Sequence, residues 1–505
     1  MHHSALPEYF PITESDPQMY TLGEFPPLLK DFANEPPGVI YFLPVYTENS
    51  ETLENTLKAI CDNVRFLEQQ GVPSNKIAVV MFQDGYSEIK DSVVGLAEKL
   101  NLFHPEQVFG THGNTYHCFA SELKYSDCPK FTFISCLKRK NKGLHDSLFW
   151  FLNLFCVNLE PKYCALLHCG VQPAPDATFL LLQKLQSSPK VAGACGQVKV
   201  KNPNYYNYIE ASQDAEYILN NILEKPFRSL LGLASSKSFV AYKWNSLKET
   251  LDSRVLQREQ SCALSNAVYS YQALITAELV PKNCEFVNQA KSYTVIPKHT
   301  GPLVAQRKKW VNGDLFSLKY YLSTKLPIYT MVSSLSTGLQ CLAPGIIYLL
   351  VHIALERSFG ARTLLEVFYG FLWFLVVVVS LGNQPQDNAL VLLVLGILQT
   401  GVIMFAVGLY TNQMYIWESS AWVVVFIFAY LAVVLLLSLL YGELVSLGVG
   451  IIQYMMMLPF YFNLYLVYGF CNLNVLPQKR FRNFRTRFLV GWVSVNFGLV
   501  VFFTV

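Results

Sequence analysis

Apolar and polar positions follow two different patterns along this chain of 505 residues. Up to about residue 325 short apolar runs alternate with polar segments, whereas residues 326–505 are overwhelmingly apolar. Stretches of about 18 or more residues with few charges are long enough to cross a bilayer as helices. The pattern predicts an N-terminal extension over 1–37, a globular domain over 38–325 with an interfacial segment at 300–325, and a transmembrane domain over 326–505.

The transmembrane part offers five or six candidate helices. Five full spans would place the basic residues around Arg307 and those at 479–487 on opposite sides of the membrane, although cytoplasmic loops attract basic residues. We therefore expect one candidate to be interfacial or re-entrant, and Pro344-Gly345 points to the first of them. The candidates lie near residues 329–355, 363–381, 389–410, 419–440, 445–470 and 488–505.

Short β-rich runs in the globular part end repeatedly in polar loops. Val39–Tyr46 is followed by Thr47-Glu48, and Ile77–Phe82 leads to Asp84. Later runs lead into the lysine-rich segment Lys138–Lys142 and into His168. Apolar positions at helical spacing after the first run predict a strand and helix alternation, and hence an α/β fold with a parallel sheet.

Ligands of open α/β sheets bind beyond the carboxyl ends of the strands. Asp84, Lys138, Lys140 and His168 could therefore converge on one nucleotide-sized site. A chance set of surface loops would give the same pattern in isolation, so this stays one of two alternatives at this point.

A cationic cluster with an aromatic residue, Gln306-Arg307-Lys308-Lys309-Trp310, lies about twenty residues before the first long apolar run. A polyanion or a sugar diphosphate is the natural ligand for such a cluster, because leaving-group charge needs fixed cations. In the alternative interpretation Lys308 and Lys309 only extend toward the membrane interface and Trp310 is an interfacial anchor.

Charge and cysteine usage add little to the choice of partner. The net charge of +3 favours no nucleic-acid partner. The first residues, Met1-His2-His3-Ser4, lack the pattern of a signal peptide, and this predicts that the globular domain is cytosolic. The irregular spacing of the cysteines, mostly within apolar segments, predicts reduced buried thiols and neither disulfides nor a zinc site. The cysteines considered are Cys61, Cys118, Cys128, Cys136, Cys156, Cys164, Cys169, Cys195 and Cys262.

Several short motifs of the globular part resemble, in the same order, those of chitin synthases, the processive family 2 glycosyltransferases that polymerise N-acetylglucosamine from UDP-N-acetylglucosamine. The resemblance covers roughly residues 40–320 and implies a cytosolic glycosyltransferase-A-type domain, Rossmann-like with a mainly parallel sheet, followed by a multi-span helical membrane domain. In chain order the motifs are Tyr46-Thr47-Glu48, Asp84-Gly85, the lysine-rich segment with Ser147–Trp150, Ala192–Lys199, Gln213-Asp214-Ala215-Glu216-Tyr217, Glu224-Lys225-Pro226, Phe239–Lys243, and Gln306–Trp310 with Asn312-Gly313.

The resemblance also implies roles for individual residues. Thr47, Glu48 and Asp84 would hold the uridine and Lys138 would face the nucleotide, while Gln306, Arg307, Lys308 and Lys309 would neutralise the diphosphate. Trp310 would stack on the acceptor sugar, as an indole suits the apolar face of a sugar. The implied partners are UDP-N-acetylglucosamine, the growing glycan, the bilayer, and a second copy or an active chitin synthase. The implied location is the plasma membrane or secretory vesicles.

Two acidic positions of the family are replaced in this chain. The family's Asp-Val-Gly, whose aspartate ligates a divalent metal, falls on His168-Cys169-Gly170, so His168 is the metal ligand that the alignment offers for Mn²⁺ or Mg²⁺. A neutral imidazole suits magnesium poorly. The family's Glu-Asp-Arg, whose aspartate is the general base, falls on Asn266-Ala267-Val268, and no side chain there accepts a proton. A missing base costs about 10²- to 10⁴-fold in rate.

Two functions remain open on this evidence. The first is a chitin-synthase-like membrane glycosyltransferase with a degenerate active site. The second is an inactive relative that serves as partner, regulator or scaffold of an active synthase. Loss of both carboxylates favours the second, and the retained Asp84, Gln306, Arg307 and Trp310 favour the first.

Overall fold

The computed structural model describes Leu29, Phe32 and residues 35–504, apart from 86–87, 101, 103–107, 113–115, 124, 126–127, 139, 237, 254–270, 280, 324–326, 357–361, 415–420 and 474–478. The chain divides into two compact units. The sheet unit comprises Met1–Lys201, Glu224–Gln260 and Tyr271–Val295, and the helical unit comprises Asn202–Leu223, Ser261–Ser270 and Ile296–Val505.

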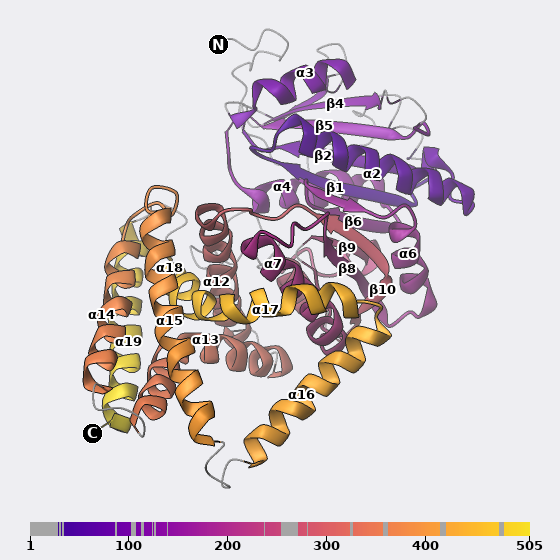
Figure 1. Ribbon diagram of the computed structural model, residues 1–505. Helices are drawn as coiled ribbons and strands as arrows, with labels where there is room; N and C mark the ends of the chain where they lie inside the picture. Colours follow the sequence, from indigo (N-terminus) through magenta and orange to yellow (C-terminus); the bar gives the residue numbers. More distant parts are fainter. Residues whose placement is uncertain are drawn as a thin grey trace. The chain divides into compact units, whose positions relative to one another are not determined.

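The sheet unit is built on a ten-stranded mixed sheet in the order β3-β4-β5-β2-β1-β6-β9-β8-β10-β7 (Figure 1). Its central strands β5, β2, β1 and β6 run parallel. This confirms the α/β fold with parallel central strands. The strands are β1 Val39–Val45, β2 Ile77–Gln83, β3 Val108–His112, β4 Tyr116–Glu122, β5 Thr132–Lys138, β6 Tyr163–Leu167, β7 Val171–Pro173, β8 Val191–Val200, β9 Phe239–Lys243 and β10 Asn283–Thr294.

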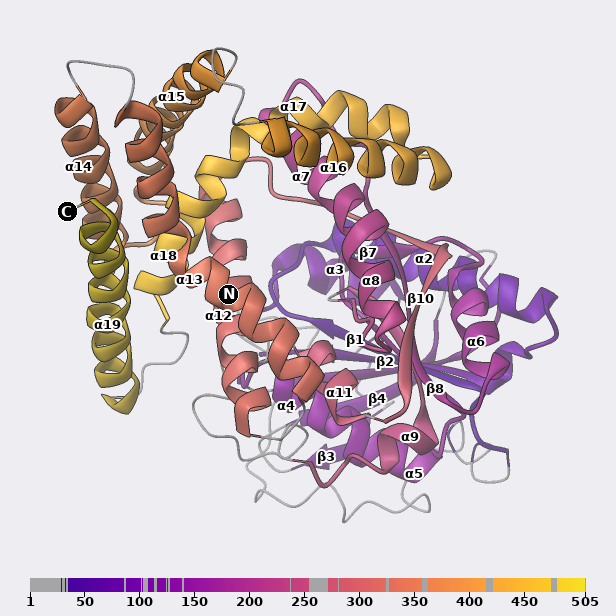
Figure 2. The same cartoon turned by 90° about the horizontal axis from the view of Figure 1, so that it is seen from below.

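Helices cover both faces of this sheet (Figure 2). Strand β1 is apolar at nearly every position because successive side chains point to opposite faces and both faces are covered. Tyr41 and Leu43 join the core under α2, whereas the Phe42 ring lies 5.0 Å from that of Phe151 on the other face. The helices of this unit are α2 Ser50–Gln69, α3 Asp91–Leu100, α4 Leu144–Trp150, α5 Val157–Leu159, α6 Ala177–Ser187, α8 Lys225–Leu230, α9 Trp244–Lys248 and α11 Tyr271–Glu278, with a π-helical stretch at Phe151–Cys156.

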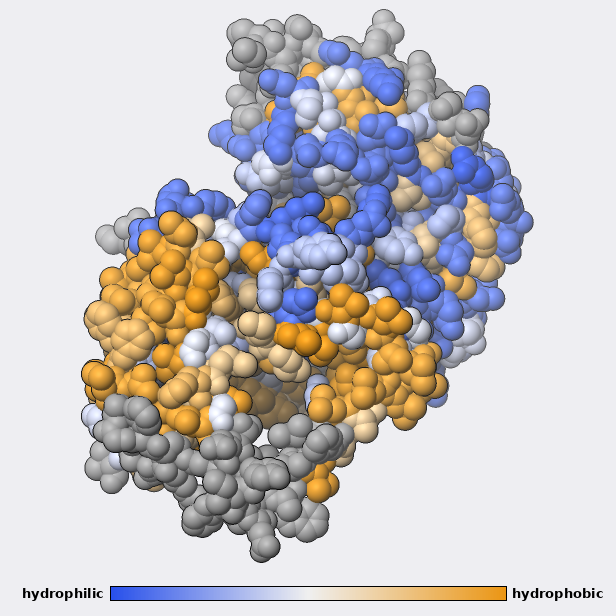
Figure 3. Space-filling view, in the orientation of Figure 1, coloured by the Kyte–Doolittle hydropathy of each residue, from blue (hydrophilic) through white to orange (hydrophobic). Residues whose placement is uncertain are grey.

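The helical unit contains the apolar part of the chain. Hydrophobic side chains gather over α14, α15 and α16 (Figure 3). Helix α17 packs closely on α7, since a Cβ at Gly450 would lie 2.8 Å from the carbonyl oxygen of Ala211. The helices are α7 Tyr208–Leu219, α12 Thr300–Ser323, α13 Pro327–Glu356, α14 Arg362–Ser380, α15 Ala389–Met414, α16 Ala421–Leu440, α17 Leu444–Phe460, α18 Leu466–Cys471 and α19 Lys479–Thr504, with π-helical Tyr461–Tyr465 between α17 and α18.

Five helical segments in the described residues are long and apolar enough to cross a membrane, so the chain is a multi-pass membrane protein. The first expected span is among them, with Pro344 inside α13, and within the described residues the fourth candidate contributes the shorter apolar helix Ala429–Leu440. Our choice of the first candidate as the interfacial one stays a prediction. The five are Ser334–Leu355, Thr363–Ser380, Ala389–Leu409, Leu444–Cys471 and Phe484–Thr504.

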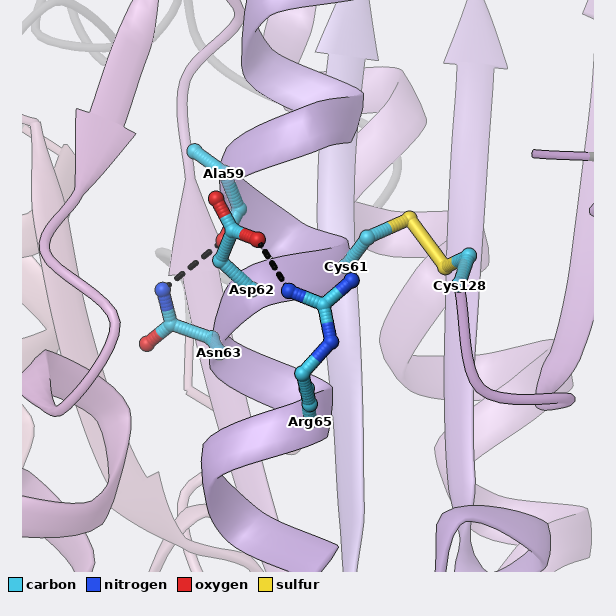
Figure 4. The surroundings of a disulfide bond; sticks show 6 residues. All are labelled: Ala59, Cys61, Asp62, Asn63, Arg65 and Cys128. Carbon is cyan, nitrogen blue, oxygen red and sulfur yellow. Dashed lines mark hydrogen bonds and ion pairs between the residues drawn. A yellow bond between two sulfur atoms is a disulfide. The ribbon is translucent and has the colours of Figure 1, made fainter. Parts of the chain in front are cut away.

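The cysteine prediction was wrong for one pair, because Cys61 and Cys128 form a disulfide (Figure 4). Cys61 lies on α2 and Cys128 lies in the connection from β4 to β5, 67 residues later. The spacing of cysteines along the chain cannot reveal such a pair, because α2 and the connection from β4 to β5 come together only through the topology of the sheet. The remaining cysteines among the described residues are free, and Cys262 lies outside the described residues.

Candidate functional site

A buried ionic network stands where β2 and β5 end. The ammonium nitrogen of Lys138 lies 2.7 Å from Oδ1 of Asp84 and 2.9 Å from Oδ2 of Asp146. The Lys138 side chain is fully buried, and it also donates to the hydroxyl of Ser147 at 3.2 Å. The amide of Lys142 donates to Asp84 Oδ1 at 3.1 Å, so the carboxylate organises the loop that follows β5. The structure thus brings Asp84 and Lys138 together, whereas Lys140 is exposed.

Asp146 is a member of this network that the sequence analysis missed. It lies in the first turn of α4, three residues after Gly143, whose φ of 87° favours glycine. An acidic residue in the first turn of a helix is also favoured by the helix dipole, which gives a reason for its presence without any ligand. Only the pairing of β5 with β2 shows that this carboxylate shares a lysine with Asp84.

Thr47 and Glu48 lie in the loop between β1 and α2. Oε2 of Glu48 accepts a hydrogen bond from the amide of Tyr46 at 2.5 Å, while the Thr47 side chain is exposed. The amide of Asp84 donates to the carbonyl of Val45 at 2.8 Å, which joins the ends of β1 and β2. The loop is thereby held beside the ionic network, at the same edge of the sheet.

His168 follows β6, the other parallel neighbour of β1. Its Nε2 lies 3.3 Å from the hydroxyl of Tyr271, and its amide donates to the carbonyl of Ser238 at 3.1 Å. Desolvation lowers the pKa of His168 to about 4 although the side chain is only half-buried, so the ring is neutral at physiological pH.

This strand end does not fit the divalent metal that the family resemblance implies. Mg²⁺ and Mn²⁺ favour carboxylate and other oxygen ligands, whereas the position offers one neutral imidazole that is hydrogen-bonded to a tyrosine. Within the described residues no group of three histidine, cysteine or acidic side chains could hold a metal ion.

The cluster on α12 is organised by an ion pair within the helical unit. Both terminal nitrogens of Arg307 lie 2.5 Å from the carboxylate oxygens of Glu216 on α7. The Arg307 guanidinium carbon also lies 4.3 Å from the centre of the Trp310 ring. Gln306 and Lys308 are half-buried and Lys309 is exposed. The structure therefore joins Arg307 to Trp310 and to Glu216, a partner that the sequence analysis did not propose.

Asn266-Ala267-Val268, the segment aligned with the family's catalytic base, lies outside the described residues. The roles assigned to the residues above stay predictions.

The chain is similar in sequence to several chitin synthases. The chitin synthase 2 of Cryptococcus neoformans var. grubii is 25% identical, over 86% of this chain and 55% of its own length. The chitin synthase 1 of Phytophthora sojae is 22% identical, over 87% of this chain and 56% of its own length. The chitin synthase 2 of Mycosarcoma maydis is 28% identical, over 70% of this chain and 40% of its own length. The chain thus spans about half the length of the curated relatives it matches.

Solved structures give a weaker likeness. A mannosyltransferase from Pyrobaculum calidifontis in complex with GDP-Man and Mn²⁺ is 11% identical to this chain and has a TM-score of 0.35. The superposition covers 88% of this chain and 90% of the mannosyltransferase chain. A glucosyl-3-phosphoglycerate synthase from Mycobacterium tuberculosis, in complex with Mn²⁺, UDP and glucosyl-3-phosphoglycerate, has a TM-score of 0.30 at 13% identity, covering 61% of this chain and 87% of its own. TM-scores this low carry no argument about function.

The family model supplies the assignment. The model of the chitin synthase-like glycosyltransferase domain matches residues 39–325, which is more than half of the chain and includes the whole sheet of the structure. Together with the apolar helices that follow, this match makes the chain a membrane-embedded member of the chitin synthase-like glycosyltransferase family.

Proposed function

We propose that this protein keeps the nucleotide half of a chitin-synthase-type donor site and transfers sugar slowly or not at all. The donor is UDP-N-acetylglucosamine, as in the family whose motifs the chain carries. Asp84 and Glu48 face the uridine from the ends of β2 and β1, and Lys138 holds Asp84 in place. Lys308 and Lys309 supply positive charge for the diphosphate, and Trp310 receives the acceptor sugar.

The observation that carries the proposal is the contrast between Asp84 and His168 on neighbouring strand ends. Asp84 is fixed by the buried ammonium of Lys138, so the uridine side is preorganised. His168 is neutral and hydrogen-bonded to Tyr271. The sequence position of the family's aspartate holds no carboxylate, so the leaving-group charge on UDP goes without that stabilisation.

The chain's own residues can still bind and orient a nucleotide sugar. Carboxylate acceptors suit the N–H and hydroxyl groups of uridine, and flexible lysines attract phosphate as point charges. Proton removal from the acceptor hydroxyl is the step without a candidate, since the family's base aligns with Ala267. Binding without efficient transfer is the expected result.

The corresponding cellular role is that of a partner or regulator of an active synthase, either as a hetero-complex or as a nucleotide-sugar sensor. The second candidate is a working glycosyltransferase whose proton acceptor comes from another loop. The retained nucleotide side and Trp310 favour that candidate, because a scaffold that binds no sugar has no use for them.

One sample tests both candidates. Full-length protein in lipid nanodiscs is assayed for UDP release from UDP-N-acetylglucosamine with Mn²⁺ or Mg²⁺, and for UDP binding by calorimetry. We expect UDP binding with turnover at least about 10²-fold below that of an active synthase measured in parallel. Turnover at the rate of the active synthase would overturn the proposal, and absence of both binding and turnover would leave a scaffold only.

A further inference from the structure

We propose that Glu216 and Arg307 are positioning residues that hold the indole of Trp310 as the platform for the acceptor sugar, and that Arg307 does not bind the diphosphate. The inference rests on the proposed function for the sugar that Trp310 receives. It assigns a role to Glu216, and it changes the role that the resemblance gave to Arg307.

The geometry of the ion pair fixes the guanidinium group of Arg307 on the carboxylate of Glu216. Each terminal nitrogen of Arg307 faces one oxygen of Glu216 at 2.5 Å, which is the bidentate arrangement that fixes a guanidinium in one plane. The Arg307 side chain is only 3% exposed, while that of Glu216 is 32% exposed. The burial of the guanidinium and its pairing with this carboxylate leave it poorly accessible to a phosphate.

Charge leads to the same conclusion. The Glu216 carboxylate neutralises Arg307, and a diphosphate that approached the pair would meet that carboxylate as well. Lys309 is exposed and Lys308 is half-buried on the same helix, so these two lysines are the cations of the Gln306–Trp310 cluster that a diphosphate can reach.

The fixed guanidinium in turn fixes Trp310. Positions 307 and 310 lie one turn apart on α12 and share a face. A separation of 4.3 Å between the guanidinium carbon and the ring centre is within cation–π distance. Because Glu216 anchors the plane of the guanidinium, it also limits the orientations that the stacked indole can take. Trp310 is half-buried, so part of the indole remains within reach of a ligand.

The surroundings explain why the pair cannot be replaced without effect. Tyr217 and Tyr461 lie close enough to Arg307 to influence it electrostatically, and Nε of Arg307 has no hydrogen-bond partner within the described part of the chain. Removing the Glu216 charge would leave a buried guanidinium unpaired, which is strongly unfavourable. We expect the guanidinium to move toward solvent, and the indole to lose its support.

The test uses full-length protein in nanodiscs that carries 5-fluorotryptophan, with the resonance of position 310 assigned from Trp310→Phe. In Glu216→Gln we expect the fluorine resonance of Trp310 to shift and broaden. The affinity for chitotetraose should fall about three- to tenfold, the range expected when an aromatic contact is lost, with UDP affinity changed less than twofold. The exchanged pair Glu216→Arg with Arg307→Glu should recover part of both signals.

Lys309→Met is the matched control, since it removes an exposed cation of the same helix. We expect it to weaken UDP binding and leave the Trp310 resonance in place. A Glu216→Gln protein with unchanged resonance and unchanged chitotetraose affinity would overturn the inference. So would a loss of UDP affinity in Glu216→Gln as large as that in Lys309→Met, because Arg307 would then serve the diphosphate. A wild-type protein that binds neither ligand would refute the proposed function, and the fluorine shift alone would then decide whether Glu216 positions Trp310.

Discussion

The strands β2 and β6 flank β1 in the sheet, and their carboxyl ends carry opposite kinds of chemistry. After β2, Asp84 belongs to a charged network with Asp146 and the fully buried Lys138. After β6, His168 is neutral and bonded to Tyr271. Because different strands supply the two halves of such a site, one half can be kept while the other changes, and the fold tolerates both states.

The largest expected effect comes from breaking the charged end. Lys138→Met leaves Asp84 and Asp146 as buried carboxylates without their common cation, which we expect to cost about 3–5 kcal/mol of stability and to abolish UDP binding. The measurement is thermal unfolding together with UDP calorimetry in nanodiscs. Lys140→Met is the control, since Lys140 is exposed two residues away. Equal behaviour of the two variants would show that the network has no structural importance.

The disulfide links α2 to the segment that precedes β5, since Cys61 lies on α2 and Cys128 lies just before β5. Strand β5 ends at Lys138, the cation of the charged network. Loss of the disulfide should cost about 2–4 kcal/mol, because cross-linking residues 67 apart restricts the unfolded chain. Cys61→Ser, Cys128→Ser and the double variant should be destabilised equally, as expected when both residues act through one bond. Additive losses on thermal unfolding would contradict the cross-link.

The neutral end can be converted toward the charged one. His168→Asp restores an anionic oxygen ligand after β6, and we expect Mn²⁺ affinity to rise about tenfold, since ligand charge sets the affinity of such sites. Electron paramagnetic resonance of free Mn²⁺ measures this directly, without reliance on turnover. His168→Asn has a similar shape without charge and serves as the control. If His168→Asp binds Mn²⁺ no more tightly than His168→Asn, the missing carboxylate does not account for the difference between the two strand ends.

A last, pH-dependent effect concerns Lys225, a buried cation of the sheet unit outside both strand ends. Its ammonium donates to the carbonyl of Gly196 at 2.9 Å, and burial lowers the pKa of Lys225 to about 8. Since the unfolded chain keeps the ordinary pKa of about 10.4, it binds more protons than the folded chain between pH 8 and 10. Stability should therefore rise with pH in that window, by at most about 1.4 kcal/mol per pH unit.

Lys225→Met removes this titration, so the wild-type slope between pH 8 and 10 should exceed that of the variant. Parallel pH profiles of the unfolding midpoint would check it. Identical slopes would mean that Lys225 stays charged in the folded protein.

The fold was predictable because its signals are local. The β-rich run at Val39 and the helical spacing of Leu53, Leu57 and Ile60 appear as β1 and α2, with Asn49 as the N-cap that accepts from the amide of Thr52 at 2.8 Å. The length of the apolar stretches similarly indicated the membrane helices. Such features need no knowledge of which segments meet in space.

The missed features all depend on distant contacts. Glu216 and Arg307 are 91 residues apart, and Cys61 and Cys128 are 67 apart. Asp146 is close to Lys138 in sequence, yet its role emerges only because β5 pairs with β2 and brings Asp84 to the same lysine. A single sequence shows which residue types are present, but the sheet topology and helix packing decide which of them share a charge.

The most direct test of the central claim is UDP titration of the full-length protein in nanodiscs, once with EDTA and once with Mn²⁺. A preserved nucleotide side beside a strand end without a carboxylate predicts UDP binding with the same dissociation constant, within about twofold, in both conditions. An affinity that rises tenfold or more with Mn²⁺ would contradict the account, because the strand end at His168 would then hold the metal after all.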